Sequence, residues 1–332
     1  MVLATRWASL SDLAPLTIIL TVFVAPSPSF TIISATTAAV SVTVAEEAPP
    51  RRSRNETLYF AFRNRKLVIG LSVVTFFLAL AIVGPWLTDA TPFEFGYPTG
   101  EPPSREYWLG TTAPGQDVFA QFVYGLRSSF VVGALAGCVA AAIGMTVGFV
   151  GGYRGGAVDE ILSVLTNVVL VIPTLAVLII VAAYLSVQSL LAEAVLIGVT
   201  SWPWAARAIR AQTFSLASRD FISVARLSGQ TGWKIVAKEI APNMSSYLFL
   251  VFILLFGGSV LIAATLDFLG LGPSQVMSLG LMLNNAVSGS ALQLGMWWWF
   301  IPPGVGITAI VGGLYVMNVG LDEVFNPKLR ET

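Results

Sequence analysis

The residue types that most often perform catalysis are nearly missing from this chain. Its 332 residues include no histidine and one cysteine, which excludes Ser-His-Asp and Cys-His nucleophilic sites and histidine ligation of zinc or haem. Cys138 lies in an apolar run, which predicts a small buried packing residue. The sequence contains no GxxxxGK[ST] phosphate loop, so any ATP used must be hydrolysed on another polypeptide. We therefore expect no catalytic residue, no metal site and no cofactor on this chain.

Two acids and several tryptophans remain as candidates for contact with a small molecule. Glu193 and Asp267 are the acids nearest the apolar segments, and an acid inside a membrane is a functional candidate. The alternative is that each acid lies close enough to a helix end to be hydrated and has no functional role. The candidates for a substrate pathway are Trp202, Asp267, Trp297 and Trp298. For the run Trp297–Phe300, an aromatic belt at the membrane interface is the alternative.

The elements that position these residues are membrane helices. Hydrophobic residues make up 55% of the chain and charged residues 11%, whereas soluble domains carry about 25% charged residues. A bilayer core about 30 Å thick needs roughly 20 apolar residues in a helix. We therefore expect an all-α polytopic membrane protein with six transmembrane helices. Their expected bounds are 67–87, 130–152, 161–185, 190–206, 247–266 and 297–320.

The basic residues fall mainly on one side of this arrangement. With the N-terminus inside, fifteen of the 18 Lys and Arg lie in inside segments, and only Arg105 and Arg127 lie in outside loops. This is the positive-inside pattern of a multi-pass protein of the cell membrane with both termini in the cytoplasm. The 18 acidic residues balance the basic ones, so no overall field attracts nucleic acid.

Small residues form a stripe along the second predicted span. They are Gly133, Gly137, Ala141, Gly144, Gly148 and Gly152, spaced three or four apart. Such a stripe lets helices approach closely. We expect it to pack inside the helix bundle, and lining a gate is the alternative.

The inside segment 207–242 is too long for a simple turn and carries six basic residues. Its apolar spacing predicts a helix from Ser218 to Ser228, which Gly229 ends. A second short helix is expected over 233–240, stopping before Pro242. The expected product is a helix-turn-helix elbow in the cytoplasm. Either a soluble partner docks on this elbow, or its helices lie on anionic lipid.

At the elbow the chain resembles the permease subunits of ATP-binding-cassette importers. Their cytoplasmic signature is an EAA tripeptide, then a glycine six residues after the glutamate and a proline thirteen residues later. The corresponding positions here are Ser223-Val224-Ala225, Gly229 and Pro242. The spacing is kept, but Ser223 replaces the glutamate and Val224 replaces the first alanine. The shape of the docking element is therefore expected, and an ion pair made by that glutamate is not.

Further motifs are similar to those of the second permease in the oligopeptide, dipeptide and nickel group, over about residues 55–330. In chain order they are Trp108–Thr111 with Gly115–Asp117, Gly151–Gly156 with Asp159, Ile172-Pro173, Trp202 with Ala206-Arg207, Phe268–Gly272, and Asn318–Asp322 with Asn326–Arg330. Each motif is weak alone, and their common order and spacing make the resemblance specific.

The resemblance implies a type I ABC importer permease fold that forms half of the translocation pathway for oligopeptides. It implies a heterodimer with a homologous permease subunit, two ABC ATPase subunits that bind ATP and Mg, an extracytoplasmic solute-binding protein, and surrounding membrane lipid. The elbow then becomes the coupling element to the ATPases. Its expected contact or shape residues are Arg219, Phe221, Ser223, Val224, Ala225, Arg226, Leu227, Gly229, Trp233 and Pro242.

The cargo has two candidate classes. The Trp-rich start of the last span, the sequence Glu239–Asn243 and the tail Gly320–Glu323 resemble members of the group that import oligosaccharides, so the same machinery carrying oligosaccharides is the alternative to oligopeptides. An ion-coupled secondary transporter is less favoured, because buried acids are scarce and no inverted repeat is detected. A membrane enzyme would need converging catalytic groups, and the sequence offers none.

Residues 1–54 stand apart from the rest. They are expected to be an N-terminal extension, either disordered or the result of a start codon assigned too far upstream, ahead of a transmembrane domain at 55–332. Leu13–Ala25 is apolar but too short to span a membrane. It also has features of a signal peptide, which is the alternative.

Overall fold

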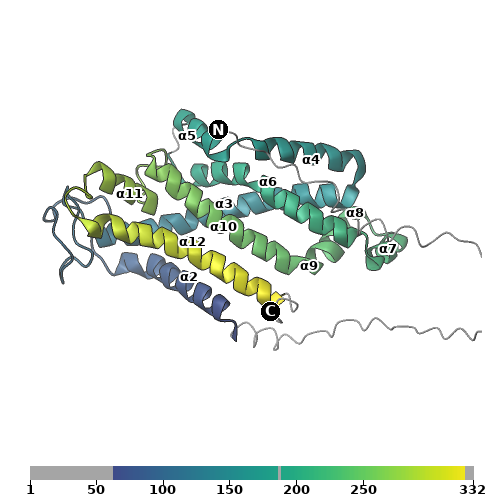
Figure 1. Ribbon diagram of the computed structural model, residues 1–332, viewed down its shortest axis with the longest axis horizontal. Coiled ribbons are helices and arrows are strands. Elements are labelled where there is room, and N and C mark those ends of the chain that lie inside the picture. The colour runs from purple at the N-terminus through teal and green to yellow at the C-terminus, as the bar shows by residue number, and fades with distance from the viewer. Residues whose placement is uncertain (1–62, 186–187, 326–332) are drawn as a thin grey trace, which may run out of the picture. The chain divides into compact units, whose positions relative to one another are not determined.

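A computed structural model describes residues 63–185 and 188–325 (Figure 1). The expected extension 1–54 and the tail motif 326–330 lie outside the described residues. The helices are α2 (Arg65–Val83), η2 (Gly84–Trp86), α3 (Val118–Arg154), α4 (Gly156–Val171), α5 (Thr174–Leu185), α6 (Leu190–Ala217), α7 (Asp220–Leu227), α8 (Gly232–Ile235), η3 (Val236–Ile240), α9 (Ala241–Asn243), α10 (Ser245–Phe268), α11 (Leu279–Ser288) and α12 (Trp297–Phe325).

Within the described ranges, four helical segments are long and apolar enough to cross a membrane: α2 with η2, α3, α10 and α12. The pair α4 and α5 makes a fifth if it counts as one span, although it bends by 77°. The bend falls at Ile172-Pro173, where Ile172 is extended with φ −76° and ψ 126°. Proline disfavours helical backbone in the residue before it, so the apolar stretch 161–185 is divided between two helices.

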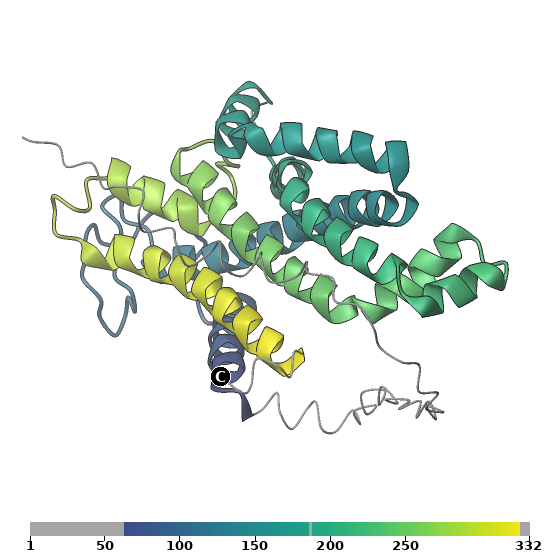
Figure 2. The same cartoon turned by 45° about the vertical axis from the view of Figure 1, so that its right-hand side comes forward.

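Helix α3 is the central element, and α6 and α10 pack along it (Figure 2). Its 37 residues extend over roughly 55 Å. A Cβ atom added at Gly137 would lie 3.2 Å from the Phe256 backbone on α10, and one added at Gly148 would lie 2.8 Å from the Ile209 Cβ on α6. Gly152 likewise faces the α6 backbone, at 2.7 Å from the Arg210 oxygen. The predicted role of the small-residue stripe in bundle packing is confirmed.

Helix α12 packs along α2, and glycines set the distance between the two. A Cβ atom at Gly70 would lie 2.4 Å from the Met317 nitrogen, and one at Gly320 would lie 2.3 Å from the Leu67 nitrogen. Near the start of α2, the Lys66 Nζ forms a salt bridge of 2.5 Å with Glu323 near the end of α12. The first described residues and the last therefore lie on the same side of the bundle.

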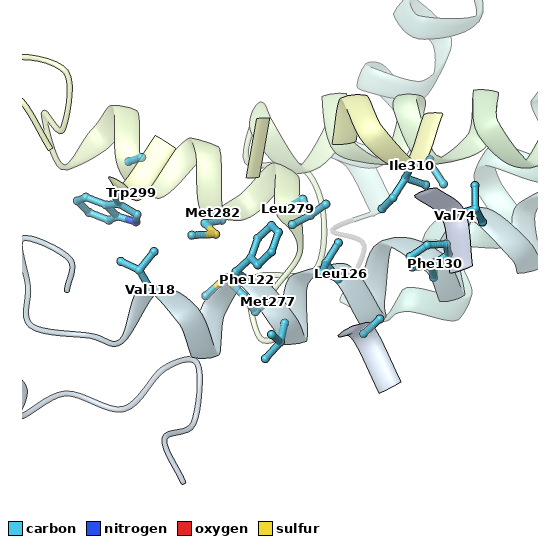
Figure 3. Packing of buried hydrophobic residues seen from close by; sticks show 14 of the residues in the cluster. Val74, Val118, Phe122, Leu126, Phe130, Met277, Leu279, Met282, Trp299 and Ile310 are labelled. Atoms are coloured by element: carbon cyan, nitrogen blue, oxygen red, sulfur yellow. The ribbon is translucent and has the colours of Figure 1, made fainter. Parts of the chain in front are cut away.

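The core comprises three groups of buried side chains. One joins α2, α3, α10, α11 and α12, and includes Leu126, Leu279 and Trp299 (Figure 3). A second joins α3, α6, α10 and the segment after α6, and a third joins α3, α5, α6 and α10. Cys138 belongs to none of them. It is exposed on α3, so the prediction of a buried packing residue is wrong. The reason is that an apolar run in a membrane helix continues over its outer face, since lipid is as apolar as the core.

Candidate docking elbow and transport path

The segment after α6, residues 218–243, forms a short helical elbow. Helix α6 continues to Ala217, so the first eleven residues of the predicted inside segment extend that helix. Helix α7 ends in a Schellman motif, in which the Gly229 nitrogen donates to the Arg226 oxygen and the Gln230 nitrogen donates to the Ala225 oxygen. Gly229 has a φ of +74°, a conformation that glycine adopts without a steric cost. The elbow therefore turns sharply at the residue that the sequence indicates.

The second half of the elbow differs in detail from the expected helix 233–240. Helix α8 is only four residues long, and the chain continues as a π-helical turn over Val236–Ile240. Pro242 then lies in the first turn of α9, where its missing N–H costs nothing because the first N–H groups of a helix have no partner. The wide turn allows helical backbone to continue through the proline instead of stopping before it.

Five apolar side chains anchor the elbow to the bundle. Ile222, Ile235 and Ile240 are fully buried, and Ala225 and Val236 are nearly so. They belong to one cluster with buried residues of α3, α6 and α10. The elbow is therefore packed firmly on these three long helices.

The opposite side of the elbow is apolar and exposed. Leu227 is 89% exposed, Trp233 74%, Val224 61% and Phe221 39%. An exposed apolar patch of this kind normally marks an interaction surface. The polar residues named from the sequence on and beside α7, Arg219, Ser223 and Arg226, are exposed, and so is Pro242 in α9. We call the group Phe221, Val224, Leu227 and Trp233 the docking face.

Tyr153, at the end of α3, holds the two halves of the elbow together. The Arg226 guanidinium lies 5.3 Å from the centre of its ring. A Cβ atom at Gly232 would lie 2.8 Å from a ring carbon of Tyr153, so α8 packs directly on the ring. A pocket of about 380 Å³ beside them is bordered by Trp233. Sequence reasoning assigned Tyr153 no role, although it lies within the motif Gly151–Gly156.

An ion pair fixes the neighbouring helices behind the elbow. The Arg210 guanidinium of α6 donates two hydrogen bonds to the Asp159 carboxylate in the first turn of α4. The nearby Arg207 donates to the Asn167 side chain at 2.6 Å. The sequence indicates Asp159 only as part of a motif, and the structure explains the acid: it pairs with the Arg210 guanidinium.

At the other end of the bundle, the three adjacent tryptophans have different surroundings. Trp299 is buried in the core, at 1% exposure, and Trp297 is 52% exposed. The Trp298 Nε1 donates to the Thr111 backbone oxygen at 3.1 Å, which ties α12 to the loop between α2 and α3. The run is therefore not a uniform stacking surface.

That loop surrounds a hollow of about 320 Å³ with an acidic and aromatic lining. Tyr97 and Tyr107 lie there edge to face, with ring centres 6.0 Å apart. Burial and the carboxylates of Glu94, Asp117 and Asp89 raise the pKa of Tyr97. These carboxylates, rather than the shift itself, make the hollow acidic.

In the middle of the bundle, Trp202 and Trp204 also differ. Trp202 is buried at 8% exposure among residues of α3 and α6, whereas Trp204 is 46% exposed. Trp204 lines a pocket of about 240 Å³ between α4, α5, α6 and α10. The Ser201 and Ser259 hydroxyls there have no hydrogen-bond partner among the described residues. Asp267, the fourth candidate, is buried on α10 at 5% exposure and contacts Glu193 of α6.

With this geometry established, comparisons with known proteins assign the family. Residues 142–331 match the family model described as binding-protein-dependent transport system inner membrane component. This match covers more than half of the 332 residues. The chain belongs to this family. Its matched part includes the elbow and all helices from α4 to α12.

Curated relatives extend the likeness toward the N-terminus. The dipeptide transport system permease protein DppC of Alkalihalophilus pseudofirmus is 32% identical over 271 residues, which cover 81% of this chain and 88% of the relative. The oligopeptide transport system permease protein OppC of Bacillus subtilis is 28% identical over 278 residues, covering 81% and 88%. A probable D,D-dipeptide transport system permease protein, DdpC, of Escherichia coli is 28% identical over 258 residues, covering 77% and 85%. As a member of this family, the chain is a permease subunit and a multi-pass membrane protein.

Proposed function

We propose that the chain is one of two permease subunits in an ATP-driven, binding-protein-dependent importer of oligopeptides, where it forms half of the translocation pathway. The observation that carries the proposal is the elbow, because it presents an exposed apolar docking face on residues that are anchored to three long helices. Membership of the permease family supports the transport role. The names of the relatives, which are dipeptide and oligopeptide permeases, support the cargo.

In this proposal the membrane is crossed six times, with the bent pair α4 and α5 as one crossing and α6 as another. Both termini and the elbow are then cytoplasmic, and the loop between α2 and α3 is outside. The partners are a homologous permease, two ATPase subunits that bind ATP and Mg, and an extracytoplasmic solute-binding protein. The fifteen basic residues of the inside segments support this orientation.

The mechanism is a coupling of two states. ATP closes the pair of ATPases, and the elbow of each permease moves with the subunit that it contacts. The buried side of this elbow packs on α3, α6 and α10. Its displacement is therefore passed to α6 and α10, which border the pocket that Trp204 lines. The chain itself performs no catalysis. It transmits the motion and lines the path.

Oligosaccharides are the second candidate cargo. The exposed Trp204 ring and the hydroxyls of Ser201 and Ser259 border one pocket. Sugars stack on aromatic faces and exchange hydrogen bonds with hydroxyl groups, and amide groups of a peptide can use the same hydroxyls. The names of the relatives favour the peptide.

The test is uptake by the purified complete complex in liposomes, with the binding protein outside and ATP inside. Labelled trialanine should accumulate only when ATP and the binding protein are both present, and an excess of a cello-oligosaccharide should not compete. Uptake of the sugar with no uptake of the peptide would show that the cargo is an oligosaccharide. Accumulation driven by a proton or sodium gradient without ATP would contradict the importer.

A further inference from the structure

Two buried carboxyl groups meet between α6 and α10, at the end of the bundle opposite the elbow. Glu193 lies in the first turn of α6 and Asp267 in the last turn of α10, and they are 1% and 5% exposed. Their side chains are in contact. Ala194 and Leu266, the residues next to them in sequence, belong to the buried apolar cluster that joins α3, α5, α6 and α10. The pair therefore lies in an apolar environment rather than in solvent.

Within residues 63–185 and 188–325, no basic group neutralises this pair. Neither oxygen of Glu193 accepts a hydrogen bond from any N–H or O–H of the described residues. Arg127 and Cys138 on α3 and Tyr184 on α5 are exposed, and the residues of α11 include no titratable side chain. Among the described residues, Asp267 is the one side chain that interacts electrostatically with Glu193. Those that interact with Asp267 are Ser278 and Glu193.

Two ionised carboxylates cannot coexist in such a place. Burying one uncompensated carboxylate costs several kcal/mol, and a second one in contact adds direct repulsion. One proton removes both problems, because the protonated group donates a charge-assisted hydrogen bond to the other. Pairs of carboxyl groups that share a site hold one proton for this reason.

The surroundings differ enough to assign the proton. Asp267 lies in the last turn of α10, whose dipole opposes a negative charge. This effect is offset by the Ser278 hydroxyl, which Asp267 contacts and which stands at the N-cap of α11, where a negative charge is favoured. The turn after α10 closes over Asp267: a Cβ atom at Gly272 would lie 1.6 Å from its Oδ1. Glu193 also starts a helix, but it has no donor at either oxygen. The carboxylate is thus Asp267, and the acid is Glu193.

We infer that Glu193 and Asp267 form a binding site for a single proton, which bonds α6 to α10 at the outer end of the bundle. Water that enters between the two helices solvates both carboxyl groups, and the proton then leaves. The contact between α6 and α10 is therefore a lock that holds at low and neutral pH and weakens as the pH rises.

Infrared spectroscopy of the purified chain in detergent tests the proton directly, without any transport. A carbonyl band of a protonated carboxyl group should be present at neutral pH and should vanish in Glu193→Gln. The matched control is Glu160→Gln, which alters an exposed acid of α4 and should leave the band unchanged. Absence of the band in the wild-type chain at neutral pH overturns the inference.

Thermal unfolding across pH tests the lock. The folded pair binds one proton, whereas the same acids in the unfolded chain are ionised near neutrality, so raising the pH favours unfolding. The ratio of folded to unfolded chain should fall by up to about tenfold per pH unit as the pH rises above about 5, where the acids of the unfolded chain are ionised and the folded pair still holds its proton. Gln at position 193 keeps a donor that does not titrate, so this variant should lose that dependence while Glu160→Gln keeps it.

Two results contradict the assignment. If Glu193→Gln and the wild type show the same pH dependence, the pair does not exchange a proton. If sodium ions stabilise the wild type at alkaline pH and the infrared band is absent, the occupant is a metal cation. Should Glu193→Gln not fold, Asp267→Asn tests the pair instead: Glu193 still holds a proton in that variant, so the carbonyl band should remain at neutral pH but shift in frequency, and an unshifted band would show that the two groups do not share the proton.

Discussion

Leu227 on the docking face provides the most quantitative test of the elbow. Its side chain is 89% exposed, so it contributes little to the fold of its own chain and can be buried almost completely by a partner. Leu227→Ala removes three carbon atoms, each worth about 0.8 kcal/mol when buried. We expect a loss of about 2.4 kcal/mol in the free energy of binding, which is roughly a 50-fold weaker affinity for the ATPase.

The assay is titration of the purified ATPase subunit onto the permease pair in nanodiscs, with thermal unfolding measured in parallel. The melting temperature of Leu227→Ala should match the wild type, because surface substitutions of this kind change stability by less than about 0.5 kcal/mol. The matched control is Leu292→Ala, since Leu292 is 64% exposed at the opposite end of the bundle. An affinity of Leu227→Ala equal to that of Leu292→Ala would refute the assignment of the docking face.

The buried side of the elbow should respond in the opposite way. Ile222 lies one residue from Phe221 and is fully buried. Ile222→Ala should cost about 2–5 kcal/mol of folding free energy and lower the melting temperature. If Ile222→Ala were as stable as the wild type, the elbow would not be anchored to the bundle as described.

Three further outcomes follow from the packing. Gly229→Trp should abolish uptake with normal membrane insertion, because a side chain at a φ of +74° strains the turn and the indole would project beside the docking face, where nothing lies within 4 Å of the Cβ atom; uptake at the wild-type rate would contradict docking there. Gly148→Leu should destabilise the bundle by about 1–3 kcal/mol in a melting experiment, whereas Gly304→Leu, which has open space, should not. Trp298→Phe removes the hydrogen bond to the Thr111 oxygen and should speed hydrogen exchange in the loop between α2 and α3 at a cost of about 1 kcal/mol; unchanged exchange would show that this bond does not hold the loop.

Sequence reasoning could find the features that depend on local patterns. The stripe of small residues in α3 predicts close helix packing because glycine spacing and helix geometry are both local properties. The same holds for Gly229, since a helix followed by glycine predicts a left-handed turn wherever the helix lies. The family could be recognised because its motifs keep their order along the chain.

Other features depend on contacts between distant segments, which one sequence does not reveal. Trp202 and Trp204 are two residues apart, yet one is buried and the other lines a pocket, because the face of α6 that meets α3 is fixed by tertiary packing. Glu193 and Asp267 each lie near a helix end, where solvation was the simple alternative. Only the approach of α6 to α10 brings them together in an apolar cluster.

The central claim is that the docking face of the elbow contacts an ATP-hydrolysing subunit. Cys138 is the only cysteine, so Cys138→Ser with Leu227→Cys gives a single attachment point for a cysteine-linked photo-crosslinker. Irradiation of membranes that contain the complete complex should yield one main adduct, with the ATPase subunit, identified by mass spectrometry. The same crosslinker on Leu292→Cys should not yield it. Adducts with lipid alone at position 227, in membranes where the ATPase is present, would contradict the claim.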